Sequence, residues 1–234
     1  MRPGRPHYPE ALFDYLASLV RRRTLAWDCG AGSGQAAIPL ASRFERVVAT
    51  DISAAMLGQA APNPRVEYYA AAAEASGLPD RAVDLVTVAQ ALHWLDLNAF
   101  YDEAQRVLAP GGVLAVWTYG LQQLGDSALD DELGRFYHQE VGPYWPPERR
   151  HVETGYRSLP FPFGELVPPG FVMEANWAWN SWWPTSGPGR PPSVAGSEQG
   201  AIQSSRSGES WRSLGRLAHA FRQMAAKPPG WKTG

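Results

Sequence analysis

The stretch "LAWDCGAGSGQAA" at residues 25–37 places three glycines within five positions, directly after an apolar segment that contains an aspartate. The apolar segment 24–29 is typical of a short buried strand, and the alanine-rich segment 35–44 predicts a helix. Glycines allow the main chain to approach a ligand closely, and a following helix presents free backbone N–H groups to it. We therefore predict a strand, a glycine turn and a helix that together hold a ligand.

The same alternation of apolar segments and helical segments continues on both sides of this stretch. Strands are predicted at 46–51, 65–70, 84–92 and 113–119, and helices at 8–20, 53–60, 97–108 and 126–141. Strands that are nearly continuous in apolar residues and separated by helices indicate a parallel sheet covered on both faces. We expect an α/β fold with a doubly wound, mostly parallel sheet, in which "APGG" (109–112) forms the turn into the fifth strand.

The pattern weakens towards the C-terminus. A strand is predicted at 170–177, but 17 of the 30 residues from 181 to 210 are Gly, Pro or Ser. We expect a domain at 1–176 and a tail at 177–234. The tail has two interpretations: a low-complexity, disordered segment, or the product of a frameshift near residue 177, since a permitted back-translation of 177–190 read in another frame gives an amphipathic helix.

Composition excludes several classes of function. Residues 1–176 carry 14 Lys and Arg against 21 Asp and Glu, which argues against a nucleic-acid-binding surface. Cys29 is the single cysteine, so no disulfide framework exists, and a reducing, cytoplasmic compartment is expected. No apolar run approaches the roughly 18 residues of a membrane-spanning helix. The other histidines show no metal-ligand spacing, so no metal is predicted; they are His7, His138, His151 and His219.

The spacing of the glycines limits the kind of ligand. The dinucleotide pattern Gly-x-Gly-x-x-Gly counted from Gly30 requires glycine at 35, where the chain has Gln35. A carboxylate at Asp28 repels a pyrophosphate and suits a ligand with an ammonium group, which favours S-adenosylmethionine. Asp51 ends the next strand 23 positions later, near the offset of roughly 20 at which such folds bind ribose hydroxyls. Asp51 as a helix cap is the alternative, although Ser53 can serve equally well.

Six segments in this order resemble class I S-adenosylmethionine-dependent methyltransferases of the type 11 group, and within it the trans-aconitate and ubiquinone/menaquinone-biosynthesis methyltransferases. The resemblance covers about residues 5–176. The segments are "RPHYP" (5–9), "DCGAGSGQ" (28–35), "VVATDIS" (47–53), "AAAEASGLPD" (71–80), "DLVTVAQALHW" (84–94) and "RVLAPGGVLAVW" (106–117).

The resemblance implies a set of residues that hold the cofactor. They are Tyr8, Asp28, Gly30, Ala31, Gly32, Asp51, Ile52, Met56, Ala73, Glu74 and Gln90. By this resemblance the glycine loop carries the methionine end, with Asp28 ordering the loop and its ammonium contact. Asp51 binds the ribose, the two hydrophobic residues after it pack on the adenine, and Tyr8 belongs to a covering N-terminal segment. Ala72 stands where many relatives carry an aspartate that contacts the adenine amino group.

The methyl acceptor is expected to be a small molecule that binds near His93, Trp94 and Tyr119. His93 has three open interpretations: a general base, a group that orients an acidic acceptor, or an ordinary structural histidine. A carboxylate is one candidate acceptor, and it is a nucleophile without deprotonation. The sequence therefore identifies no catalytic residue, and no obligate protein partner is evident.

Three competing functions were weighed against this one. Base-amino methyltransferases end their fourth strand in an Asn/Asp-Pro-Pro-aromatic motif, whereas this chain has "QALHW" (90–94). A nicotinamide oxidoreductase is opposed by Gln35. A cofactor-binding but inactive remnant is the third alternative, because the irregular tail replaces the antiparallel strand that normally closes the family's sheet.

Overall fold

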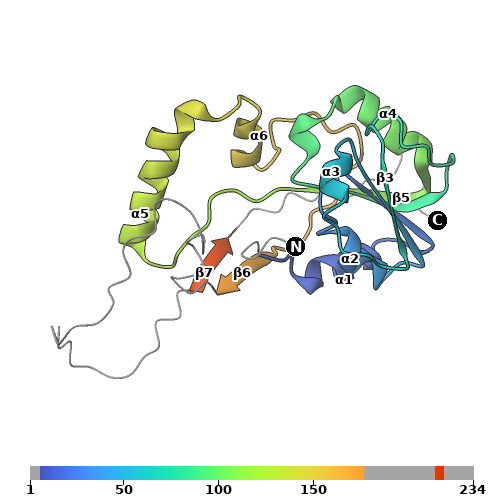
Figure 1. The fold of residues 1–234 in the computed structure, drawn as a ribbon, viewed down its shortest axis with the longest axis horizontal. Helices are drawn as coiled ribbons and strands as arrows, with labels where there is room; N and C mark the ends of the chain where they lie inside the picture. The colour runs from blue at the N-terminus through green and yellow to red at the C-terminus, as the bar shows by residue number, and fades with distance from the viewer. Residues whose placement is uncertain (1–5, 177–213, 219–234) are drawn as a thin grey trace, which may run out of the picture.

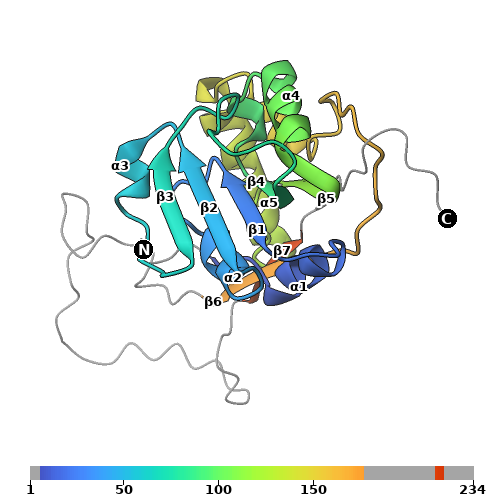
Figure 2. The same cartoon turned by 90° about the vertical axis from the view of Figure 1, so that its right-hand side faces the viewer.

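The computed structural model of the protein describes residues 6–176 and 214–218, and its centre is a five-stranded parallel sheet. The strands are β1 (Leu25–Cys29), β2 (Arg46–Asp51), β3 (Val66–Ala70), β4 (Val83–Ala89) and β5 (Leu108–Trp117). Their order across the sheet is β3-β2-β1-β4-β5, as Figure 2 shows face-on. The prediction of an α/β, doubly wound parallel sheet is confirmed.

The strand order reverses between β1 and β4. The chain builds outward from β1 through β2 to β3, then returns to place β4 on the other side of β1. Both carboxyl ends meet at this reversal, where the connecting segments leave towards opposite faces and open a crevice. This point of the fold positions the site described below.

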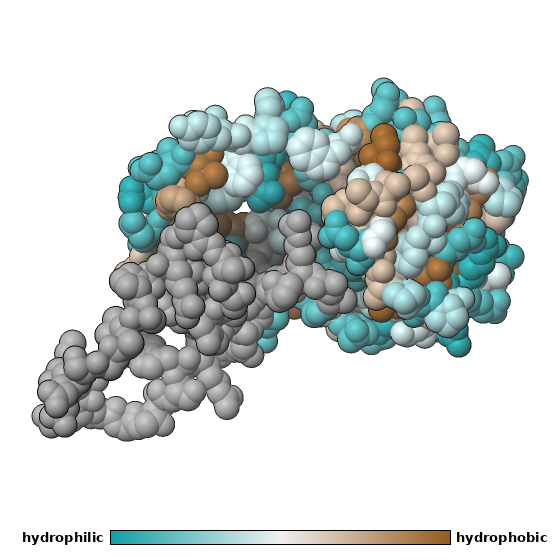
Figure 3. Space-filling view, in the orientation of Figure 1, coloured by the Kyte–Doolittle hydropathy of each residue, from teal (hydrophilic) through white to brown (hydrophobic). Residues whose placement is uncertain are grey.

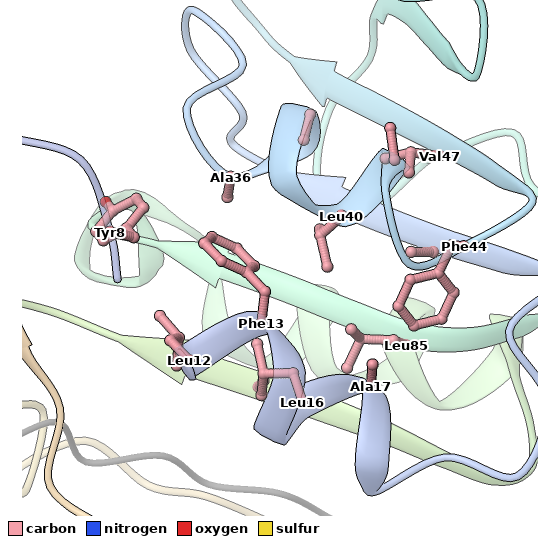
Figure 4. Packing of buried hydrophobic residues seen from close by; sticks show 14 of the residues in the cluster. Tyr8, Leu12, Phe13, Leu16, Ala17, Ala36, Leu40, Phe44, Val47 and Leu85 are labelled. Atoms are coloured by element: carbon pink, nitrogen blue, oxygen red, sulfur yellow. The ribbon is translucent and has the colours of Figure 1, made fainter. Parts of the chain in front are cut away.

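Helices cover both faces of the sheet and bury its apolar side chains. On one face lie α1 (Glu10–Ser18) and α2 (Ala37–Ala41), and the helix residues that Figure 4 labels there are Leu12, Phe13, Leu16, Ala17 and Leu40. On the other face α4 (Leu97–Val107) packs Phe100 against Trp27 of β1, with ring centroids 6.1 Å apart. Each strand alternates between these two cores, so one-residue shifts of register would expose the apolar set.

Several element boundaries differ from those predicted. The helix expected at 35–44 is limited to the five residues of α2, which contains Pro39. The helix α3 (Ala54–Leu57) is followed by Gly58. Strand β5 begins earlier than expected, at Leu108, and the register against β4 shifts between Val83 and Leu85. The predicted "APGG" turn is therefore an irregularity within one long strand.

Further elements follow the sheet. The helix expected at 126–141 is α5 (Ser127–Arg135) continued by a π-helical segment, η2 (Phe136–Val141). Two 3₁₀ turns are η1 (Leu92–Trp94) and η3 (Gly142–Tyr144). The short helix α6 (Arg149–Glu153) was not predicted. In Figure 1, α5 lies apart from the sheet, beyond the end of β5.

The expectation that no strand follows residue 181 is wrong at one place. Residues Leu214–Ala218 form β7, which pairs antiparallel with β6 (Val172–Asn176) in a separate two-stranded sheet. The sequence "LGRLA" has no β-branched residue, so it carries no strand signal. The strand predicted at 170–177 is confirmed as β6. The disordered-tail and frameshift interpretations concern 177–213 and 219–234, which lie outside the described residues.

No helix among the described residues is both long and apolar enough to cross a membrane.

Candidate functional site

A cleft of about 220 Å³ lies at the point where the strand order reverses, beside the glycine turn. Eight of the predicted site residues line it: Tyr8, Asp28, Gly30, Ala31, Gly32, Asp51, Gln90 and Trp94. They come from the N-terminal segment and from the ends of β1, β2 and β4. The cleft therefore brings together residues that are up to 86 positions apart in the chain (94 − 8).

The three glycines of the turn all have positive φ angles, a conformation that side chains disfavour. A Cβ on Gly30 would lie 2.6 Å from the Cβ of Ala91, and one on Gly34 would lie 2.7 Å from the hydroxyl of Tyr68. At Gly32 the nearest atom is the methyl group of Met56, at 3.7 Å. Gly30 and Gly34 thus allow close packing within the protein, whereas at Gly32 the positive φ is the main constraint.

Asp51 fixes the glycine turn to the end of β2. Its Oδ2 accepts a hydrogen bond from the backbone N–H of Gly32 at 2.9 Å, and its Oδ1 accepts one from the backbone N–H of Ser53 at 2.8 Å. Ser53 caps α3, with its side chain accepting from the N–H of Met56 at 3.3 Å. The cap alternative for Asp51 is therefore not needed, and its carboxylate retains lone pairs at the cleft.

Asp28 is a buried carboxylate with one unsatisfied oxygen. Its Oδ1 accepts a hydrogen bond from the hydroxyl of Thr87 at 2.9 Å, while its Oδ2 has no hydrogen-bond partner among the described residues. Only 1% of the residue is exposed, and this burial raises the pKa of the carboxyl group to about 7, with the Thr87 bond acting against the shift. A cation that entered the cleft would relieve this desolvation.

Gln90 is the junction between β4 and β5 at the far side of the cleft. Its φ of +59° is unusual for a residue with a side chain. Its amide NH₂ donates to the carbonyl oxygen of Tyr119 at 2.7 Å, and its Oε1 accepts from the hydroxyl of Thr118 at 2.8 Å. These bonds hold the residue in this conformation at the end of the strand.

The three residues predicted to face the acceptor lie in different surroundings. Trp94 is 59% exposed and lines the cleft. His93 is half-buried and is not one of the described residues that line the cleft; its Nδ1 lies 2.9 Å from the hydroxyl of Tyr156. Tyr119 packs against Tyr8, with ring centroids 6.2 Å apart. The acceptor roles of these residues stay predictions.

Four predicted cofactor residues do not line the cleft. Ile52 is 84% exposed and Met56 is 37% exposed, so both present apolar surface next to Asp51. Ala73 packs in the core cluster that contains Trp27, and Glu74 is exposed. These four lie on the β2–β3 side of the sheet, where the resemblance places the adenine.

A second cavity of about 340 Å³ lies beyond β5, and its wall includes Thr118, Leu121, Tyr137 and Val152. Because the Thr118 hydroxyl donates to Gln90, this cavity and the cleft share a wall. Figure 3 shows the molecule hollowed between the part that carries α5 and α6 and the part that carries the sheet.

Sequence analysis missed several residues that support the site. Thr87 is the partner of Asp28, and its place as a polar residue within an apolar strand was the available signal. Gln35, noted only because it is not glycine, donates to the backbone carbonyl of Pro6 and so holds the N-terminal segment at the cleft. Tyr156 lies in a segment for which no structure was predicted.

The comparisons with known proteins agree with this arrangement. Residues 27–116 match the family described as "Methyltransferase domain". The solved structure of a "Putative Type II Methyltransferase" from Anaeromyxobacter dehalogenans is 48% identical to this chain, covering 76% of this chain and 75% of that one with a TM-score of 0.71. The chain belongs to the S-adenosylmethionine-dependent methyltransferase family of type 11.

Other relatives extend the comparison. A methyltransferase of Mycobacterium tuberculosis described as uncharacterized is 41% identical over 162 residues, which are 68% of this chain and 61% of that protein. A Dictyostelium discoideum protein named as a putative methyltransferase is 40% identical over 157 residues, 65% of this chain and 59% of that protein. The chain thus spans about three-fifths of these relatives' length. The finer likeness to trans-aconitate and quinone methyltransferases stays a prediction.

Proposed function

We propose that this methyltransferase-family chain binds S-adenosylmethionine in the glycine cleft and transfers its methyl group to a small-molecule acceptor. The observation that carries this proposal is the buried oxygen of Asp28 that has no partner, in a cleft whose glycine turn is fixed by Asp51. An unpaired buried carboxylate is costly, and the ammonium group of the cofactor is a cation of suitable charge. The residues present therefore fit the cofactor.

Each part of the cleft has a role in this proposal. Asp28 and the backbone of Gly30–Gly32 hold the methionine end, and the lone pairs of Asp51 accept hydrogen bonds from the ribose hydroxyls. Ile52 and Met56, whose apolar side chains are exposed, pack on the adenine. Tyr8, held at the cleft by the contact of Gln35 with Pro6, helps to exclude water.

The bound cofactor supplies a methyl group that is already activated by a sulfonium. The task of the protein is then to hold the acceptor in line with that group, and such positioning accounts for several orders of magnitude in rate. Gln90 and Trp94 form the side of the cleft nearest the second cavity. We infer that the acceptor approaches from that side.

A carboxylate is our first candidate for the acceptor group. The segment 149–157 brings three arginines against one glutamate into an otherwise acidic chain, and Arg157 lies on the wall of the second cavity. A carboxylate attacks without losing a proton, which agrees with the lack of an assigned base. We also propose that 1–176 is the cofactor-binding domain and 177–234 a separate tail; limited proteolysis that leaves a stable product ending near residue 176 would support this division.

The proposal is tested by methyl transfer from labelled S-adenosylmethionine to a panel of small carboxylic acids and their amides. We expect transfer to at least one acid and none to its amide. Binding of S-adenosylmethionine without transfer to any member of a broad acceptor panel would favour the inactive remnant. Binding of NAD in place of S-adenosylmethionine would favour the oxidoreductase.

A further inference from the structure

A hydrogen bond joins η1 to the segment after α6, outside the cleft itself. We propose that Tyr156 is a positioning residue that donates its phenolic proton to Nδ1 of His93, so that His93 presents Nε2–H to an oxygen of the methyl acceptor. The proposal rests on the proposed function, because it assigns the acceptor to the neighbourhood of His93. It makes His93 a hydrogen-bond donor and excludes it as a general base.

The contact is built into the fold. His93 Nδ1 and the Tyr156 hydroxyl lie 2.9 Å apart although the residues are 63 positions apart in the chain. Tyr156 is fully buried and has a φ of +62°, directly after Gly155 at +60°. A residue with a side chain persists in this conformation only where its surroundings fix it, and such residues cluster at functional sites.

The direction of the hydrogen bond follows from the neighbouring donors. The NH₂ group of Gln90 donates to the Tyr119 carbonyl, so Gln90 Oε1 is the atom that faces Thr118. The single hydroxyl proton of Thr118 is thereby donated to Gln90. Thr118, which also interacts with the Tyr156 side chain, can then offer Tyr156 only an acceptor oxygen.

The proton of Tyr156 thus has two side-chain acceptors within reach, the Thr118 oxygen and the Nδ1 atom of His93. An imidazole nitrogen, with an ordinary pKa of about 6.5, is far more basic than an alcohol oxygen, and a phenol is the stronger acid of the pair. The proton is therefore donated to Nδ1. A neutral imidazole that accepts at Nδ1 carries its own proton on Nε2.

The surroundings keep this imidazole neutral. Burial lowers the pKa of His93 to about 4, the positive charges of Arg149 and His151 lower it further, and Glu148 acts against them. A neutral ring with Nδ1 occupied has one remaining function, donation from Nε2. The ring lies 4.6 Å from that of Trp94, which lines the cofactor cleft, so an acceptor beside Trp94 is within reach of the His93 ring.

The tautomer is measured directly by ¹⁵N NMR of the full chain labelled at histidine, because protonated and unprotonated ring nitrogens have well-separated shifts. We expect a neutral His93 with the proton on Nε2, identified by the loss of its signals in His93→Gln. Tyr156→Phe removes the proton donor and should shift the Nδ1 signal. The matched control is Tyr101→Phe, which removes a buried hydroxyl that bonds the Pro160 carbonyl at 2.9 Å; it should leave the His93 signals unchanged.

Kinetics provide the second test, with the acceptor found in the transfer assay. The amide nitrogen of Gln can replace Nε2–H as a donor, so His93→Gln should retain at least about tenfold more kcat/KM than His93→Ala, the difference expected for one hydrogen bond to a charged acceptor. Tyr156→Phe should raise KM for the acceptor and leave S-adenosylmethionine affinity unchanged.

Two results overturn the inference. One is a wild-type His93 protonated on Nδ1 with a free Nε2. The other is equal loss of activity in His93→Gln and His93→Ala, which a general base would give. Failure of the proposed function appears separately, as absence of S-adenosylmethionine binding in calorimetry on the same samples, and the NMR tautomer can be determined even then.

Discussion

The backbone N–H of Gly32 donates a hydrogen bond to the carboxylate of Asp51 at 2.9 Å, and this bond joins the glycine turn after β1 to the end of β2. The other carboxylate oxygen holds the N–H of Ser53 at the start of α3. One side chain thus fixes both the loop assigned to the methionine end and the helix beside the predicted adenine site. The predictions below begin from this relationship.

We expect Asp51→Asn to weaken S-adenosylmethionine binding by at least about tenfold, or about 1.4 kcal/mol. An Asn side chain has one acceptor oxygen, so it cannot serve Gly32, Ser53 and the ribose together. Isothermal titration calorimetry measures the change. Asp102→Asn, an exposed change on α4, is the control. Equal affinities of wild type and Asp51→Asn would contradict the ribose role.

Gly30→Ala should abolish cofactor binding, whereas Gly77→Ala should not. Both glycines have similar positive φ angles, +68° and +73°, so both substitutions carry a backbone cost of roughly 1–2 kcal/mol. Only Gly30 adds a clash, with Ala91 at 2.6 Å, while nothing lies within 4 Å at Gly77. Melting temperatures and calorimetry of the two variants separate strain from steric exclusion. Similar losses of binding in both would show that strain alone is responsible.

Asp28→Asn should make the cofactor-free protein more stable at pH 8. The folded pKa of Asp28 is raised from 3.8 to about 7, so its stabilising contribution is complete below about pH 4 and is lost as the pH rises through 7. By linkage the loss is at most about 4 kcal/mol, and the neutral amide avoids it. Melting temperatures from pH 4 to pH 8 should fall in wild type relative to Asp28→Asn. Parallel curves would show that this carboxyl group titrates normally.

The same substitution should weaken S-adenosylmethionine binding. A cationic ligand favours ionised Asp28, so wild-type affinity should rise between pH 6 and pH 7.5, with release of a proton that calorimetry detects in buffers of different ionisation enthalpy. Asp28→Asn should show no such proton release. Proton uptake on binding, or no pH dependence in wild type, would contradict the ammonium contact.

The pH dependence of kcat at saturating cofactor distinguishes the roles of His93. Because its pKa is lowered to about 4, kcat should show no inflection near pH 6.5 and should fall only as the pH approaches 4. The groups around it are Arg149, His151, Glu148 and Tyr156. An inflection near pH 6.5 that disappears in His93→Gln would show that a more basic histidine is required in its neutral form.

The fold and the centre of the cleft could be predicted from the sequence because their signals are local. Strands such as β2 are continuous apolar runs, and the glycines and Asp28 lie within one short stretch. The pairing of Asp28 with Thr87 could not be derived in this way, since it depends on β4 returning beside β1. The sequence predicted which residues meet at the switch point, and the structure adds what each of them bonds.

The surroundings of His93 show where sequence reasoning fails. Its partner Tyr156 is 63 positions away, in a turn whose left-handed backbone at a tyrosine breaks the usual rule that glycine occupies such positions. The strand β7 was missed because its pairing with β6 is likewise long-range and its residues have low strand propensity. Long-range contacts without a local signal account for both failures.

Calorimetric titration of the purified full chain with S-adenosylmethionine, and separately with NAD, tests the central claim most directly. We predict saturable binding of S-adenosylmethionine that is lost in Gly30→Ala and weakened in Asp51→Asn, with no heat of binding from NAD. Binding of NAD, or S-adenosylmethionine binding that neither substitution alters, would contradict the assignment of the glycine cleft to this cofactor.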